Sequence, residues 1–155
     1  MPTLKHHLDD HPERTEADAQ SFWIIAKKLS LMTERERISS IRSGFAVTWL
    51  LTAKTAFDLD ESAIASFADI SVKTLRQRLK KATPLDPPAS ERFDRLAQLA
   101  LLSETVFEAR GVAEDWMAAP NDSLGGEVPF FLCKTELGGR QAYRVLRAIE
   151  WGTPV

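Results

Sequence analysis

The densest cluster of side chains that could bind a charged ligand lies between residues 72 and 81. This segment contains no acidic residue and five basic ones, namely Lys73, Arg76, Arg78, Lys80 and Lys81. Arginine forms two hydrogen bonds with guanine, glutamine such as Gln77 forms two with adenine, and hydroxyl and ammonium groups suit phosphate oxygens. These residue types indicate contact with DNA, and a charged surface that is merely solvated is the alternative.

The residues around this cluster predict the element that would present it to DNA. Two short helices are expected at 60–68 and 71–81, capped by Asp60 and Ser71 and separated by a sharp turn. This is the pattern of a helix-turn-helix motif, whose second helix enters the major groove. The residues expected to contact DNA are those that the apolar positions leave outside, namely Ser71, Lys73, Thr74, Arg76, Gln77 and Lys80.

The turn between these two helices contains one departure from the usual pattern. Asp69 stands where such turns usually hold a glycine, at a position that tends to need a positive φ. Aspartate tolerates that conformation better than most residues, but its carboxylate adds a negative charge near the start of the second helix. We therefore expect the turn to form and the affinity for DNA to be modest.

Residues that could support catalysis or bind a metal are few. His6, His7 and His11 lie in a polar N-terminal stretch, at spacings that match no standard zinc site. Cys133 has no partner nearby in the sequence and is expected to be a small buried apolar residue. No glycine pair has the context of a phosphate-binding loop. The sequence therefore predicts a binding protein that uses no cofactor and no metal, rather than an enzyme.

The composition excludes a protein that binds nucleic acid through bulk positive charge. The 155 residues include 20 Lys and Arg against 22 Asp and Glu, a formal net charge of −2, so any contact with DNA must come from a local basic surface. The single cysteine rules out an intramolecular disulfide, and the sequence shows neither a signal peptide nor a long apolar run. A soluble cytoplasmic protein is expected.

Apolar residues that recur at three- and four-residue spacings predict an all-α fold without a sheet. Ser90 is expected to cap the longest helix and Gly111 to end it. The helices are expected near 21–32, 34–43, 45–57, 60–68, 71–81, 90–109, 112–118 and 136–150.

Three prolines, at positions 84, 87 and 88, predict a division of the chain, because prolines interrupt helices and favour extended conformations. The expected regions are a flexible tail at 1–20, a helical region with the helix-turn-helix at 21–83, a linker at 84–89 and a second helical domain at 90–155.

Two sets of residues resemble a known antitoxin family. Residues 70–79, Ile-Ser-Val-Lys-Thr-Leu-Arg-Gln-Arg-Leu, are similar to the family's pattern I-S-x-x-T-L-x-x-R-L in a Cro-like helix-turn-helix. The second domain resembles the family's toxin-binding domain in residue type, order and spacing, at Ser90-Glu91-Arg92-Phe93, Trp116, Pro120-Asn121, Leu124-Gly125-Gly126, Pro129, Leu132, Thr135, Gly138 and Ile149-Glu150-Trp151-Gly152. Over residues 43–155, the chain resembles the Xre-type antitoxins of RES-Xre toxin-antitoxin modules, in the wider Xre/MbcA/ParS family.

This resemblance implies a function for each domain. The Cro/Xre-like helix-turn-helix domain would bind the module's own operator DNA and repress transcription, and the small helical C-terminal domain would hold a RES-domain toxin inactive. RES toxins consume NAD, and antitoxins of this type obstruct the toxin's active site with their C-terminal end. Carried onto this sequence, the toxin-binding residues are Arg147, Glu150, Trp151, Gly152, Thr153, Pro154 and Val155.

The residue types at the C-terminal end agree with that role. A large aromatic side chain at Trp151 has few neighbours to pack against in a monomer, and Pro154 limits the entropy lost on binding. A tail folded back on its own domain is the alternative. The other residues of the family pattern are interpreted as structural, in the core or in turns: Trp116, Asn121, Leu124, Gly125, Gly126 and Pro129.

Two hypotheses about function therefore stand side by side. In the first, the chain is an antitoxin and autorepressor whose main partner is a toxin. In the second, it is a DNA-binding regulator whose C-terminal domain only mediates dimerisation. A homodimer is expected in both, because one helix-turn-helix reads only half of a two-fold symmetric site.

Overall fold

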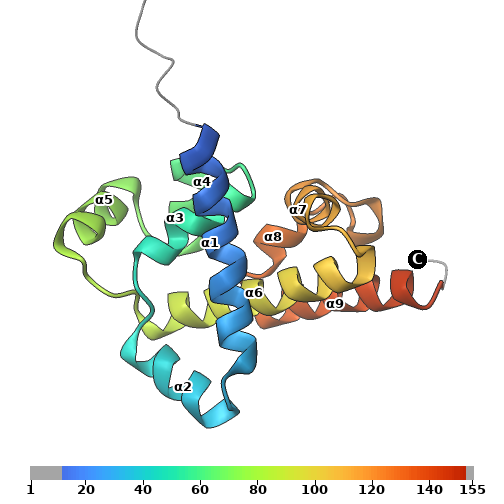
Figure 1. The fold of residues 1–155 in the computed structure, drawn as a ribbon, viewed down its shortest axis with the longest axis horizontal. Helices are drawn as coiled ribbons and strands as arrows, with labels where there is room; N and C mark the ends of the chain where they lie inside the picture. Colours follow the sequence, from blue (N-terminus) through green and yellow to red (C-terminus); the bar gives the residue numbers. More distant parts are fainter. Residues whose placement is uncertain (1–11, 153–155) are drawn as a thin grey trace, which may run out of the picture.

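The structure, a computed structural model, describes residues 12–152 and is all-α over that range, as the sequence predicts (Figure 1). No strand is formed within the described range, where only an isolated bridge pairs Asn121 with Glu127. Its helices are α1 (Pro12–Leu31), α2 (Glu34–Ser43), α3 (Thr48–Ala56), α4 (Glu61–Phe67), α5 (Val72–Lys81), α6 (Pro87–Phe107), α7 (Arg110–Ala118), the 3-10 helix η1 (Asp122–Leu124), α8 (Pro129–Leu132) and α9 (Glu136–Glu150).

Helix α1 begins earlier than the sequence analysis predicts. We expected the chain to enter its first helix near residue 21, whereas α1 starts at Pro12. Proline is accommodated in a first helical turn, and the glutamate, alanine and glutamine residues that follow favour a helix without an apolar stripe. The stripe itself is confirmed further along, where Phe22, Ala26 and Leu29 are buried against α3 and α6.

Helix α4, the turn after it and α5 form the predicted helix-turn-helix. The side chain of Asp60 accepts a hydrogen bond from the Ala63 N–H at 2.7 Å and caps α4. Asp69 has a φ of 58°, which confirms the left-handed conformation that was expected at this turn. Leu75 is fully buried and fixes the inner side of α5. The structure therefore contains the predicted motif with the predicted caps and turn.

The start of α3 is displaced because backbone groups of Phe45 bond to another part of the chain. The Phe45 N–H donates to Ser90 Oγ at 2.9 Å, and its carbonyl accepts from the Leu85 N–H at 2.9 Å. The helix that was expected at 45–57 consequently begins at Thr48. Gly44 ends α2 with a φ of 89°, and a Cβ atom on it would overlap the Leu85 carbonyl oxygen.

The prediction that Ser90 caps the longest helix is wrong. Asp86 is the cap, since its side chain accepts from the Ala89 N–H at 2.8 Å. Pro87 and Pro88 therefore occupy the first turn of α6, where a missing N–H costs nothing, and do not belong to the extended segment before it. The two consecutive prolines predicted an interruption between helices, but in the structure they begin α6.

The end of α6 also differs from the prediction. We expected Gly111 to stop this helix, but α6 ends at Phe107 and Glu108 adopts the left-handed conformation, with a φ of 54°. Gly111 lies instead in the first turn of α7, which begins at Arg110. Glu108, rather than a glycine, adopts the left-handed conformation that ends α6. The glycine in the sequence therefore predicted the wrong end for this helix.

One hydrophobic core joins the helix-turn-helix to the C-terminal helices. Phe130 of α8 is fully buried, and its ring centroid lies 4.8 Å from that of Phe67 in α4 and 5.4 Å from that of Phe57 after α3. Phe22 of α1 reaches both Phe57 and Phe93, at 5.0 and 5.8 Å. The division into domains at residues 84–89 remains a prediction, but the buried side chains on the two sides of it are in contact.

Candidate functional site

The outer surface of α5 presents the side chains that the sequence analysis assigned to DNA contact. Lys73, Arg76, Gln77 and Lys80 are exposed, while Leu75 faces the core. Helix α5 lies at one end of the molecule, away from the C-terminal end of α9 (Figure 1). The structure therefore brings the four long polar side chains to one accessible face.

The two hydroxyl residues of the same prediction interact with each other. Ser71 Oγ accepts from the Thr74 N–H at 3.0 Å and caps α5, and it donates to Thr74 Oγ1 at 2.9 Å. The Ser71 hydroxyl therefore has a structural function in the free protein, and the helix N-terminus itself remains oriented for a phosphate group.

Glu61, the first residue of α4, was missed by the sequence analysis. Its carboxylate accepts two hydrogen bonds from the Arg76 guanidinium, from Nε at 2.7 Å and from Nη2 at 2.9 Å. These hydrogen bonds lower the pKa of Glu61 and raise the pKa of Arg76. The only available signal was the helix-turn-helix geometry, which brings the start of the first helix beside the second. Both carboxylate oxygens of Glu61 are therefore engaged by Arg76 in this structure.

At the opposite end of the molecule, α9 leads to an exposed tryptophan. Trp151 is 78% exposed, and Gly152 follows it with a φ of 65°. The Trp151 side chain is therefore largely solvent-exposed and is not part of the core cluster. Thr153, Pro154 and Val155, the rest of the predicted toxin-binding segment, lie outside the described residues.

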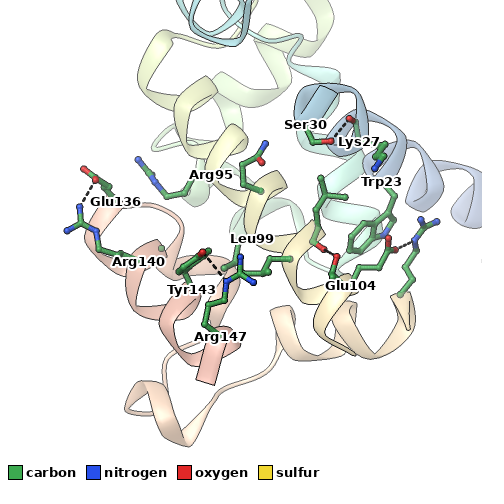
Figure 2. Close-up of a pocket in the computed structure, with 16 residues that line it drawn as sticks. Trp23, Lys27, Ser30, Arg95, Leu99, Glu104, Glu136, Arg140, Tyr143 and Arg147 are labelled. Carbon is green, nitrogen blue, oxygen red and sulfur yellow. Dashed lines mark hydrogen bonds and ion pairs between the residues drawn. The ribbon is translucent and has the colours of Figure 1, made fainter. Parts of the chain in front are cut away.

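Two further residues of the predicted toxin-binding set, Arg147 and Glu150, form an ion pair. Arg147 Nη1 donates to Glu150 Oε2 at 2.6 Å. Arg147 Nε also donates to the Tyr143 hydroxyl at 3.0 Å, a contact that Figure 2 shows. The hydrogen bond to Glu150 and that to Tyr143 raise the pKa of Arg147. The guanidinium is therefore held along the last two turns of α9, next to the exposed Trp151.

The remaining family-pattern residues have the geometry of a structural role. Asn121 Oδ1 accepts from the Ser123 N–H at 2.9 Å, which is the expected side-chain turn. Gly125 and Gly126 have φ values of 67° and 83°, so both need the conformational freedom of glycine. Pro129 is buried at the start of α8. Trp116 and Leu124, both half-buried, pack against the core.

Two buried titratable groups are structural as well. Burial raises the pKa of the Cys133 thiol to about 12, so the residue is the small apolar side chain that was expected. Burial also raises the pKa of Asp94, whose Oδ1 lies 3.3 Å from Arg37 Nε and links α6 to α2. Within residues 12–152 no cluster of three metal-ligating side chains occurs, and the three histidines lie outside the described residues.

Comparisons with known proteins match both halves of the chain. A model of the antitoxin Xre-like helix-turn-helix domain matches residues 36–98, and a model of the antitoxin Xre/MbcA/ParS C-terminal toxin-binding domain matches residues 103–152. A curated relative, the protein Antitoxin Xre of Pseudomonas putida, is 29% identical over 126 residues, covering 79% of this chain and 76% of the relative. No helix in the described part of the chain is long and apolar enough to span a membrane.

Proposed function

Because the chain belongs to the Xre/MbcA/ParS antitoxin family, with a helix-turn-helix domain followed by a toxin-binding domain, we propose that it neutralises a RES-domain toxin and represses its own operon. The observation that carries the toxin half of this proposal is the position of Trp151, a large apolar ring exposed at the end of a well-packed helix. Exposed aromatic side chains of this kind are typical anchors of protein interfaces.

The proposed mechanism of neutralisation is obstruction. The C-terminal end, from Arg147 to Val155, enters the active-site cleft of the toxin and prevents it from consuming NAD. Trp151 supplies the apolar anchor, and the Arg147–Glu150 pair supplies polar contacts beside it. Because the antitoxin acts by binding, we propose that it has no catalytic activity of its own and needs no cofactor.

The obstruction model predicts that deletion of residues 151–155 removes most of the protection while the fold is kept. Trp151 is 78% exposed and is not part of the core cluster, so its loss leaves the buried side chains in place. The measurement is growth and cellular NAD during co-expression with the RES-domain toxin encoded beside the antitoxin. Full protection by the shortened chain, at an equal protein level, would refute obstruction and move the inhibitory contact to the surface between Trp116 and Pro129.

For the DNA half, we propose that α5 reads operator DNA. In this model, Arg76 and Gln77 contact bases. Lys73 and Lys80 contact phosphates. Ser71 and Thr74 hold the N-terminus of α5 against the sugar-phosphate backbone of the DNA. Two copies of the chain bind the two halves of a symmetric operator as a homodimer. Because both proposed targets, DNA and an NAD-consuming toxin, occur in the cytoplasm, we propose that the protein acts there.

Alanine at Arg76 or at Gln77 is expected to weaken operator binding by roughly 5- to 150-fold and to relax the sequence preference, if each side chain makes a two-bond base contact. Binding should also fall steeply with salt, since phosphate contacts release counterions. The measurement is a mobility-shift titration at several salt concentrations, with Arg144→Ala at the other end of the molecule as the control. Unchanged binding by the double variant at Arg76 and Gln77 would remove α5 as the reading helix.

A pure transcription regulator is the second candidate function. In that case the C-terminal domain would bury Trp151 in a dimer interface and bind no toxin. One experiment distinguishes the two functions: the antitoxin co-purifies with a RES-domain toxin encoded beside it only if the first function is correct.

A further inference from the structure

A second surface on this molecule has the chemistry of a docking site, and it lies beside the C-terminal end of α9. It is a cleft of about 880 Å³ with α6 as its floor and α1 and α9 as its walls (Figure 2), and Arg110 of α7 completes its lining. Trp23, Lys27 and Ser30 come from α1, and Tyr143 and Arg147 come from α9.

Charged side chains line the rim of this cleft. Five of them are cations, namely Lys27, Arg95, Arg110, Arg140 and Arg147. Four of the five are paired: Arg110 with Glu104, Arg140 with Glu136 and Arg147 with Glu150, each at 2.6 Å, and Arg95 with Glu91 at 4.0 Å. These pairs are partly exposed, so solvent or a partner can compete for them. Lys27 has no ion pair among the described residues, so an acidic occupant can bind it and compete for the paired guanidinium groups.

The floor of the cleft is apolar, which favours a protein segment over a free anion. Leu99, Leu101 and Leu102 line it together with the ring of Tyr143, which is 45% exposed. The guanidinium of Arg147 lies 5.1 Å from the centroid of that ring and covers part of it. An occupant that matches both features carries acidic side chains for the rim and at least one apolar side chain for the floor.

The position of the cleft indicates which partner supplies this segment. Arg147 belongs both to the cleft and to the end of α9 that carries Trp151, so the two surfaces are continuous. Helix α5 lies at the other end of the molecule (Figure 1), so a segment in the cleft leaves the proposed DNA surface free. All of α1, including Trp23, Lys27 and Ser30, lies outside the residues that either family model matches.

We propose that this cleft binds an acidic, partly apolar segment of the toxin, as a second contact in addition to the C-terminal end. The inference rests on the proposed antitoxin function. The proposal gives α1 a role in determining which toxin is bound, because α1 forms one wall of the cleft and lies outside the residues that the two family models match.

The test is a pair of double charge reversals that differ only in position. Lys27→Glu with Arg140→Glu reverses two cations of the cleft, and Lys28→Glu with Arg144→Glu reverses two exposed cations on the same helices that do not line it. Toxin affinity is measured by calorimetry on full-length chains at low and high salt, with thermal unfolding and operator binding as checks. We expect the cleft variant to lose on the order of 10- to 100-fold in affinity at low salt, and to show a weaker salt dependence than the wild type.

Each result decides a separate question. If the wild type does not bind the toxin, the proposed function fails. If the wild type binds and both double variants lose affinity equally, only the overall charge matters and the cleft is refuted. Loss of operator binding by the cleft variant, with toxin affinity intact, would assign the cleft to nucleic acid and also refute the proposal. A folded cleft variant that alone loses toxin affinity supports it.

Discussion

Replacing Phe130 by alanine should lower the free energy of unfolding by about 3–5 kcal/mol, the usual cost of removing a buried phenylalanine ring. The ring is fully buried between Phe57 and Phe67, so its loss leaves a cavity where α8 meets the helix-turn-helix. Such a change is a large fraction of the stability of a typical domain. Chemical denaturation followed by circular dichroism measures it.

The same variant tests whether the two halves of the chain fold together. Because Phe130 joins both halves, we expect one unfolding transition in the wild type and a shift of that whole transition in the variant. Leu137→Ala is the control, since Leu137 is 63% exposed and its loss should change stability by less than about 0.5 kcal/mol. Two separate transitions, of which only one moves, would show that the halves are independent units.

Trp151→Ala is expected to weaken binding to the toxin by about 2–4 kcal/mol, which corresponds to roughly 30- to 1,000-fold in affinity. The ring is exposed in the free chain, and the proposed complex buries it in the toxin's active site. Because the ring is largely exposed and is not part of the core cluster, the stability of the antitoxin should change little. Surface plasmon resonance with immobilised toxin measures the affinity, and most of the loss should appear in the dissociation rate.

Leu137→Ala serves again as the comparison, because it removes an exposed apolar side chain from the start of α9, far along the helix from Trp151. An affinity loss below about threefold for Trp151→Ala would mean that the anchor of the interface lies elsewhere.

The helix-turn-helix could be predicted well from the sequence because its determinants are local. Asp60 and Ser71 cap their helices with side chains that are close in sequence to the N–H groups they accept from. Leu75 follows the periodicity of a buried helix position, and Asp69 adopts the conformation that its place in the turn requires. In each case the responsible residues lie within a few positions of one another.

Several features that the sequence analysis missed depend on contacts between distant segments. Phe45 leaves the helix because it bonds to Leu85 and Ser90, some 40 residues later in the chain. Glu61 meets Arg76 only once the two helices have crossed. The basic cleft brings together side chains from α1, α6, α7 and α9, and no spacing within one element reveals it.

NAD consumption by a purified RES-domain toxin, titrated with the purified antitoxin, tests the proposed neutralisation most directly. We expect toxin activity to fall to background at a fixed molar ratio for the full chain, and the chain without residues 151–155 to need on the order of tenfold more protein or above. Undiminished NAD consumption in the presence of excess full-length antitoxin would refute the proposed neutralisation.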